Sequence, residues 1–342
     1  MHFDAIGRFV PRGVPVRICV QAHVHVIEGS AETNVLEQSP RDPVQPPDRD
    51  RVSTTDEDSH PAIVSLSDIH GHLTDAQRSL LTLSDHPEYS PLVETDAARR
   101  LQWVGGEEYV LVFNGDLIDR GAHSAEIVEM AQRLTRQAPP GHVRVTVGNH
   151  ELGIAMPDLY GWSDWYSAER SDEERRAFLD LILDGHVVAA YEGYRVTYAH
   201  AGKPEPYDAE ALNDDLVTAA SELYDAVGTE DDREVQEAVT DAYPRVFGFD
   251  GRTGRGPEAG IAWLDFEYMP EDAPPQVVGH TVQRHPTREG NVVCQNVIRK
   301  NRRREGGEAV IVETPERLVA LGRDADGDIM EHEFTLPSVE YE

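Results

Sequence analysis

The chain has 342 residues, 39% of them hydrophobic, which is enough to bury a core in one large domain or two smaller ones. Acidic residues outnumber basic residues by 63 to 31, so the formal net charge is −32 with histidine neutral. Affinity for nucleic acid and anionic lipid comes mainly from lysine and arginine that neutralise phosphates, so this charge argues against both as partners.

The basic residues are unusually distributed, because lysine occurs only at Lys203 and Lys300 and every other basic residue is arginine. An acidic, lysine-poor chain would repel itself in dilute buffer, but at molar salt the Debye length falls to ~3 Å and screens that repulsion. We interpret the composition as adaptation to a salty cytoplasm. A genome that favours arginine codons, with an ordinary acidic surface, is the alternative.

Cysteine and hydropathy patterns point to a soluble, cytoplasmic protein. Cys19 and Cys294 are the only cysteines, too few and too far apart for a disulfide framework or a cysteine-rich zinc site. No stretch approaches the ~20 apolar residues of a membrane span, and the first residues lack the apolar core of a signal peptide.

We expect residues 1–59 to form an N-terminal extension and residues 60–342 a single catalytic domain. Within the extension, residues 30–59 hold few large apolar side chains, several prolines and dense charge. Such a segment cannot offset its ordering entropy by burial, so we interpret it as a disordered linker.

From residue 60 onward a pattern recurs in which a short apolar run ends in a polar cluster containing Asp, His, Asn or Gly. Short β-rich runs bounded by glycine are typical of buried strands. The predicted strands cover residues 62–66, 109–113, 143–147, 195–198 and 276–278.

Helical periodicity between the first three strands predicts βαβ crossovers and a largely parallel sheet. Ligands of such sheets lie beyond the carboxyl ends of the strands, where the polar clusters fall. Residues 205–275 interrupt the pattern with an acidic, helix-prone insertion, which we interpret as a lid or substrate wall. Residues 290–342 are expected to form antiparallel strands that complete a second sheet.

The polar clusters supply carboxylate, imidazole and amide oxygen but no thiolate, a donor set that suits Mn, Fe or Zn. They are too many for one ion that keeps open positions for water, and about right for two. The candidate metal ligands are Asp68, His70, Asp116, Asn149, His200 and His280.

The ordered motifs SDIHGH, NGDLIDRG, GNHEL, AHAG and VVGHT resemble those of the calcineurin-like metallophosphoesterase superfamily. The Asp-Arg-Gly ending of the second motif is similar to its phosphoprotein phosphatase branch. Residues 100–116 (RLQWVGGEEYVLVFNGD) also resemble a segment of the bacterial, Shewanella-like subgroup. The resemblance implies a four-layer α/β/β/α sandwich with mixed sheets and a dimetal site at the carboxyl ends of the strands.

Carried over to this chain, the resemblance implies two divalent metal ions, with Mn preferred over Fe or Zn. Asp68, His70 and Asp116 would hold the first ion. Asn149, His200 and His280 would hold the second together with the shared Asp116. A hydroxide bridging the two ions would attack the phosphorus directly.

Three further residues receive roles from the resemblance. His150 would protonate the leaving oxygen, and Asp119 would hold the other ring nitrogen of His150. Arg120 would grip the phosphoryl oxygens through its planar fork. A simple salt bridge that caps a loop is the alternative for Asp119 and Arg120.

The sequence departs from the family pattern after Trp263, where Leu264 and Asp265 follow in place of a second phosphate-binding arginine. Arg252 or Arg255, in the glycine- and arginine-rich loop before Trp263, could substitute for it. The altered phosphate grip leaves the substrate class open.

The leading hypothesis is a metal-dependent phosphatase that acts on a phosphorylated protein, of the Ser/Thr type, or on a small phosphoester. A dinucleoside polyphosphate hydrolase of the diadenosine tetraphosphate type is the rival within enzymes. A scaffold that binds metal and phosphate without turnover is the rival of another class. No oligomeric state is predicted.

Overall fold

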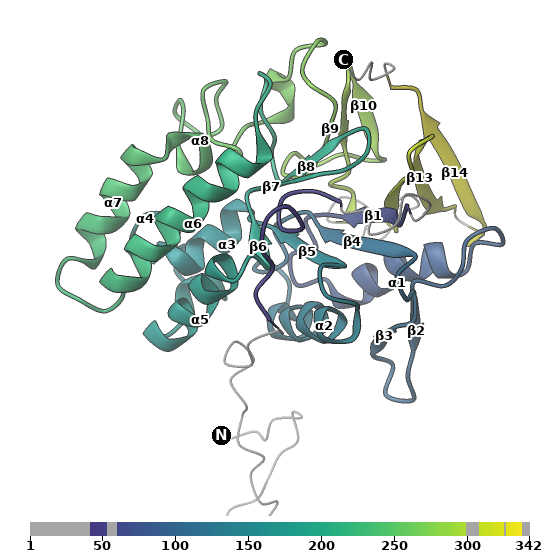
Figure 1. Cartoon of the computed structure of the whole chain (residues 1–342), viewed down its shortest axis with the longest axis horizontal. Helices are drawn as coiled ribbons and strands as arrows, with labels where there is room; N and C mark the ends of the chain where they lie inside the picture. Colours follow the sequence, from purple (N-terminus) through teal and green to yellow (C-terminus); the bar gives the residue numbers. More distant parts are fainter. Residues whose placement is uncertain (1–41, 53–59, 299–307, 325, 337–342) are drawn as a thin grey trace, which may run out of the picture. The chain divides into compact units, whose positions relative to one another are not determined.

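The computed structural model describes residues 42–52, 60–298, 308–324 and 326–336. Most of the predicted extension and linker, residues 1–41 and 53–59, therefore lies outside the described residues. The helices are α1 (Leu73–Ser84), α2 (Ser124–Gln137), α3 (Asn149–Ala155), α4 (Pro157–Tyr160), α5 (Asp172–Leu183), α6 (Ala209–Ala226), α7 (Asp232–Ala242) and α8 (Pro244–Phe247), with short 3-10 turns η2 (Ser167–Glu169) and η3 (Phe266–Tyr268) (Figure 1).

A seven-stranded mixed sheet has the order β14-β13-β12-β1-β4-β5-β6. The parallel pairing of β1 with β4 and of β4 with β5 agrees with the predicted crossovers, and β6, which was not predicted, extends this parallel part. Its strands are β1 (Ala62–Leu66), β4 (Tyr109–Phe113), β5 (Val143–Thr146), β6 (Val187–Val188), β12 (Val310–Glu313), β13 (Leu318–Arg323) and β14 (Ile329–Phe334).

A five-stranded sheet has the order β10-β11-β9-β8-β7. It contains β7 (Ala190–Glu192), β8 (Thr197–Ala199), β9 (Gln276–Val278), β10 (Thr287–Glu289) and β11 (Val292–Cys294). A separate hairpin pairs β2 (Val93–Thr95) with β3 (Leu101–Trp103).

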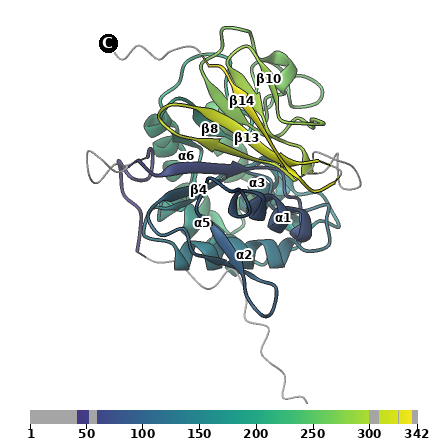
Figure 2. The same ribbon diagram turned by 90° about the vertical axis from the view of Figure 1, so that its right-hand side faces the viewer.

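The two large sheets stack face to face, and the side chains between them form a separate hydrophobic core. Alternate residues of the same strand serve different layers: Val110 and Val112 of β4 lie in the core between the sheets, and Leu111 and Phe113 lie in the core on the helical side. A strand that is buried on both faces needs a continuous apolar run, which explains the sequence YVLVF. In Figure 2, α2 lies below β4 and β8 lies above it.

Helices cover the outer sides of this stack. α1 contacts β12 and β13, α2 contacts β3 and β5, and α6 packs on β7 of the smaller sheet as well as on α5 and α7. The structure thus confirms an α/β fold with stacked mixed sheets and helices outside them.

Two details differ from expectation. The carboxyl-terminal strands β12, β13 and β14 join the first sheet through antiparallel pairing of β12 with β1, so only β11 of residues 290–342 belongs to the second sheet. The difference arises because β1 has an open edge opposite β4, which β12 covers.

Residues 42–52, expected to be linker, instead pack on the domain. The backbone N–H of Val44 donates to the carbonyl of Asp184 (2.7 Å), and Arg51 forms an isolated β-bridge with Glu192. The side chains of Val44, Arg49 and Asp50 are buried. The linker interpretation is therefore wrong for this short stretch, because its few apolar and paired charged groups find partners far along the chain.

Candidate metal centre and acid group

The predicted ligands follow strands of both sheets and meet at one place. Asp68 follows β1, Asp116 follows β4 and Asn149 begins α3 just after β5, all from the larger sheet. His200 and His280 follow β8 and β9 of the smaller sheet. Because parallel strands bring their carboxyl ends to one edge, two stacked sheets can offer ligands from two sides.

The first group lies around His70. Its Nε2 atom is 3.5 Å from Asp116 Oδ2 and 3.8 Å from Asp68 Oδ1. The Nδ1 atom faces the carbonyl of Ile118 at 3.1 Å, so Nδ1 carries the proton and Nε2 offers a lone pair. This Nε2 atom is buried and has no hydrogen-bond partner among the described residues, which is the environment a cation would complete.

The second group shares Asp116 with the first. His200 Nε2 lies 3.4 Å from Asp116 Oδ2 and 3.3 Å from Asn149 Oδ1. His280 Nδ1 lies 3.0 Å from Asn149 Oδ1 and 3.2 Å from His200 Nε2. Potential ligand atoms of His70, Asp116 and His150 all lie within 4.8 Å of one another. The same is true of Asp116, His200 and His280. The residues present therefore fit the binding of divalent cations, and Asp116 belongs to both groups of candidate ligands.

The electrostatics of the site suit cations at Asp116, His70 and His280, whereas at His200 burial is outweighed by Asp116 and Asp68, which raise its pKa to about 9. Burial alone would raise the pKa of the Asp116 carboxyl, but the imidazoles of His200 and His150 hold it well below its usual range. Burial lowers the pKa of His70 and of His280 well below the ordinary value, so both rings are neutral near pH 7. A neutral imidazole is the form that binds a metal.

The backbone is strained at the site. Asp68, His70, Asp116 and His280 adopt positive φ values of 52°, 47°, 55° and 59°. Non-glycine residues rarely adopt this left-handed region, and such strain persists only where the surroundings over-determine it, often at functional sites.

Two glycines make room for the carboxylates. A Cβ atom on Gly148 would meet Asp116 Oδ1, and a Cβ atom on Gly279 would meet Asp68 Oδ2. A side chain at either position would therefore displace a candidate ligand. This explains why glycine stands before Asn149 and before His280.

Residues outside the predicted set hold the ligands in place. Glu151 accepts hydrogen bonds from the backbone N–H groups of Asp116 (2.8 Å), Leu117 (2.8 Å) and Gly148 (3.0 Å). Asn296 Nδ2 donates to Asp68 Oδ1 at 2.7 Å and to the carbonyl of His280 at 3.0 Å. Glu151 stands in the GNHEL motif and could have been suspected, whereas no local signal marks Asn296.

His150, Asp119 and Arg120, which we call the acid group, lie beside the candidate metal ligands. His150 Nδ1 donates to Asp119 Oδ2 at 2.7 Å, and Arg120 Nη2 donates to His150 Nε2 at 2.9 Å. His150 Nε2 is 3.9 Å from Asp116 Oδ2, so the imidazole faces the candidate centre. Trp162 and Trp165 contact the ring of His150 with centroid distances of 5.2 Å and 4.9 Å.

The two predicted substitute arginines differ in position. Arg255 lies 3.4 Å from Asp265 Oδ2 through its Nε atom and 3.5 Å from Thr281 Oγ1 through Nη2. Its charge also helps to lower the pKa of His280, after burial and His200. Arg252 is exposed, and no described contact ties it to the centre.

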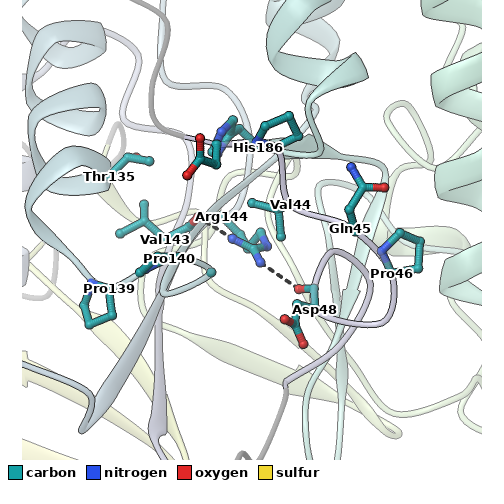
Figure 3. Close-up of a pocket in the computed structure, with 13 residues that line it drawn as sticks. Val44, Gln45, Pro46, Asp48, Thr135, Pro139, Pro140, Val143, Arg144 and His186 are labelled. Atoms are coloured by element: carbon teal, nitrogen blue, oxygen red, sulfur yellow. Dashed lines mark hydrogen bonds between the residues drawn. The ribbon is translucent and has the colours of Figure 1, made fainter.

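A cavity of about 410 Å³ lies away from these residues (Figure 3). It includes none of the predicted site residues, and it is lined by residues 42–46, Asp48, Thr135, residues 139–141, Val143, Arg144 and His186. Arg144 crosses it and donates to the carbonyl of Asp48 at 2.6 Å. The cavity therefore does not mark the centre described above.

Stacked mixed sheets with a carboxylate, imidazole and amide centre at their strand ends define an α/β protein built around a candidate dimetal site. The chain belongs to the calcineurin-like phosphoesterase family, whose model matches residues 62–250. This family confirms the resemblance seen in the motifs and the prediction of an enzyme of the phosphoesterase class.

Known proteins resemble the chain in sequence and in fold. A probable serine/threonine-protein phosphatase of Encephalitozoon cuniculi is 30% identical over 136 residues, which are 39% of this chain and 28% of that relative. A crystal structure of a cold-active protein-tyrosine phosphatase of a psychrophilic Shewanella species has a TM-score of 0.53 at 18% identity, covering 84% of this chain and 85% of that one. A second structure of a cold-active protein tyrosine phosphatase has a TM-score of 0.51 at 17% identity, covering 84% of this chain and 83% of that one. At these identities the structures support the fold.

Among the helices that the structure describes, none is both long and apolar enough to cross a lipid bilayer.

Proposed function

We propose that the protein is a phosphomonoesterase that uses two divalent cations and acts on phosphorylated proteins. The observation that carries this proposal is that five candidate ligand side chains gather around Asp116, with His150, Asp119 and Arg120 directly beside them. Asp68, His70 and Asp116 would hold one cation. Asp116, Asn149, His200 and His280 would hold the other.

The donor set of nitrogen and oxygen without thiolate favours Mn over softer metals, with Fe and Zn as the other candidates. When bound, two such cations lower the pKa of a water and stabilise charge on the phosphoryl oxygens. We assign the remaining chemistry to the side chains of the chain itself.

Arg120 would bind two phosphoryl oxygens through its guanidinium fork. In the structure its Nη2 donates to His150 Nε2, so Nε2 acts as an acceptor there. Movement of Arg120 onto a phosphoryl group would free Nε2 to take up a proton from water. His150 would then protonate the leaving oxygen while Asp119 holds Nδ1.

We favour Arg255 over Arg252 as the second phosphate-binding arginine, because Arg255 lies against Thr281, next to His280. Asp265 holds Arg255 from the other side. The Ser/Thr phosphoprotein substrate rests on the name of the matched relative. The intact acid group argues against a scaffold without turnover, since binding alone requires no proton donor.

The decisive experiment measures metal content per chain together with hydrolysis of p-nitrophenyl phosphate, a phosphoserine peptide and diadenosine tetraphosphate in high salt. We expect about two ions per chain, hydrolysis of both monoesters, loss of activity after chelation and recovery with Mn²⁺. Full activity in excess EDTA, after time for exchange, would overturn the metal-dependent mechanism. Faster turnover of diadenosine tetraphosphate than of the peptide would overturn the substrate class.

A further inference from the structure

A short segment after α4 contacts every member of the acid group. Ser167, the first residue of η2, is buried and donates two hydrogen bonds to one carboxylate. Its backbone N–H donates to Asp119 Oδ1 at 2.8 Å, and its Oγ donates to Asp119 Oδ2 at 2.8 Å. Asp119 Oδ2 is also the acceptor for His150 Nδ1, so Ser167 and His150 share one oxygen.

Two residues earlier, Trp165 contacts the other two members. Its ring stacks on the ring of His150 with a centroid distance of 4.9 Å and an interplanar angle of 22°. The Arg120 guanidinium carbon lies 5.6 Å from the centroid of the same indole. A flat aromatic face favours both a stacked imidazole and a cation, so one indole can orient both side chains.

The loop that carries Asp119 and Arg120 needs such support. Both residues adopt positive φ, 70° and 61°, one after the other. Two consecutive non-glycine residues in this region form a strained loop that would relax without outside contacts. The described contacts include Ser124 Oγ, which accepts from the N–H of Asp119 at 2.9 Å, and the two hydrogen bonds from Ser167.

We propose that Ser167 and Trp165 are positioning residues for catalysis, which hold Asp119, His150 and Arg120 in working geometry from a separate segment of the chain. This inference rests on the proposed phosphomonoesterase function. Neither residue is assigned contact with substrate.

The chemistry predicts which substrates would respond. An alkyl leaving group such as the serine oxygen needs a proton as it departs, whereas p-nitrophenolate leaves readily without one. Loss of the Ser167 hydroxyl should therefore slow turnover of a phosphoserine peptide and spare p-nitrophenyl phosphate. A general loss of folded protein would lower both rates by the same factor.

The first test is Ser167→Ala with Ser171→Ala as the matched control. Ser171 is the N-cap of α5, and its hydroxyl accepts from the N–H of Glu174, outside the acid group. We expect S167A to lower kcat on the phosphoserine peptide by roughly 10-fold, the effect of one hydrogen bond to a charged group, with p-nitrophenyl phosphate changed by less than about 2-fold. S171A should leave both rates unchanged.

A second readout needs no metal and no turnover. The low-field proton NMR signal of His150 Nδ1–H, assigned by its absence in H150N, should shift in metal-free S167A and stay in place in S171A. An unshifted signal, or equal loss of both activities in S167A, would overturn the role of Ser167.

Trp165 is tested independently, so the proposal stays falsifiable if S167A does not fold. Trp165→Phe keeps a flat ring and should retain the wild-type ratio of the two rates, whereas Trp165→Leu keeps apolar bulk and should lower the peptide rate selectively. Equal behaviour of the two variants would overturn the role of Trp165. A wild-type protein that hydrolyses neither monoester would instead refute the proposed function, which separates the two failures.

Discussion

At the scale of single residues, Asp116 is the group that both candidate cation sites share. Its Oδ2 atom lies 3.5 Å from His70 Nε2 and 3.4 Å from His200 Nε2. Replacement by asparagine removes the charge and leaves a side chain of the same size. We expect D116N to lose both metal ions and activity together, measured as metal content per purified chain.

The control is Asp214→Asn, which changes an exposed carboxylate paired with Arg49. It should keep wild-type metal content. Retention of two ions by D116N would contradict the assignment of Asp116 as the shared ligand.

His150 is predicted to act on the proton and not on the metal. We expect H150N to slow turnover of a phosphoserine peptide by about 100-fold or more, in the range typical of lost general acid catalysis, with metal content near wild type. His332→Asn, on the exposed part of β14, should change neither quantity. A large fall in metal content of H150N would mean that His150 is itself a ligand.

At the scale of elements, a buried carboxylate links the two sheets. Glu313 at the end of β12 accepts hydrogen bonds from the backbone N–H groups of Arg195 (2.5 Å) and Val196 (3.1 Å) and from the hydroxyl of Tyr198 in β8 (2.9 Å). Burial raises the pKa of Glu313 from 4.5 to about 7 despite these donors. The folded state therefore favours the protonated carboxyl.

This shift predicts a pH dependence of stability. Because the folded pKa lies above the unfolded one, the contribution of Glu313 is fully present below about pH 4.5 and is lost as pH rises through about 7, by roughly 3 kcal/mol in total. Glu313→Gln keeps an acceptor for the two N–H groups and does not titrate.

Urea unfolding of the metal-free wild type and E313Q at pH 5 and pH 8 measures this effect, since other titrating groups are common to both proteins. We expect the free energy of unfolding of E313Q to rise relative to wild type between the two pH values. Parallel changes in the two proteins would contradict the prediction.

Buried polar contacts also fix the acidic insertion to the rest of the domain. Arg175 of α5 pairs with Asp232 at the start of α7 through two hydrogen bonds of 2.6 Å and 2.9 Å, and its Nη2 also donates to the carbonyl of Ala155 at 3.2 Å. Ala155 ends α3, the helix that begins with Asn149. A substrate wall anchored in this way fits the contacts better than a freely moving lid.

At the scale of the whole molecule, the net charge of −32 predicts that stability depends strongly on salt. Repulsion among exposed carboxylates extends over ~10 Å at 0.1 M salt and only ~3 Å at 1 M. We therefore expect the thermal unfolding midpoint to rise from low salt to several molar KCl, measured by circular dichroism. Equal midpoints under both conditions would favour the codon-usage explanation of the arginine-rich composition.

The local features of this protein follow from short stretches of neighbouring residues. Apolar runs such as YVLVF predict strands that are buried on both faces, because this prediction needs only the pattern of neighbouring residues. The polar clusters that follow these strands can be recognised in the sequence for the same reason. The structure brings all six predicted ligands together at one place.

How distant segments combine depends on the packing of the folded chain. It placed β8 and β9 in a second sheet facing β1 and β4, moved β12 to the edge of β1, and brought Asn296, Ser167 and Trp165 to the site. These contacts join residues tens to hundreds of positions apart. The role of such a hydroxyl or amide depends on where the folded chain places it. No periodicity along the sequence indicates that position.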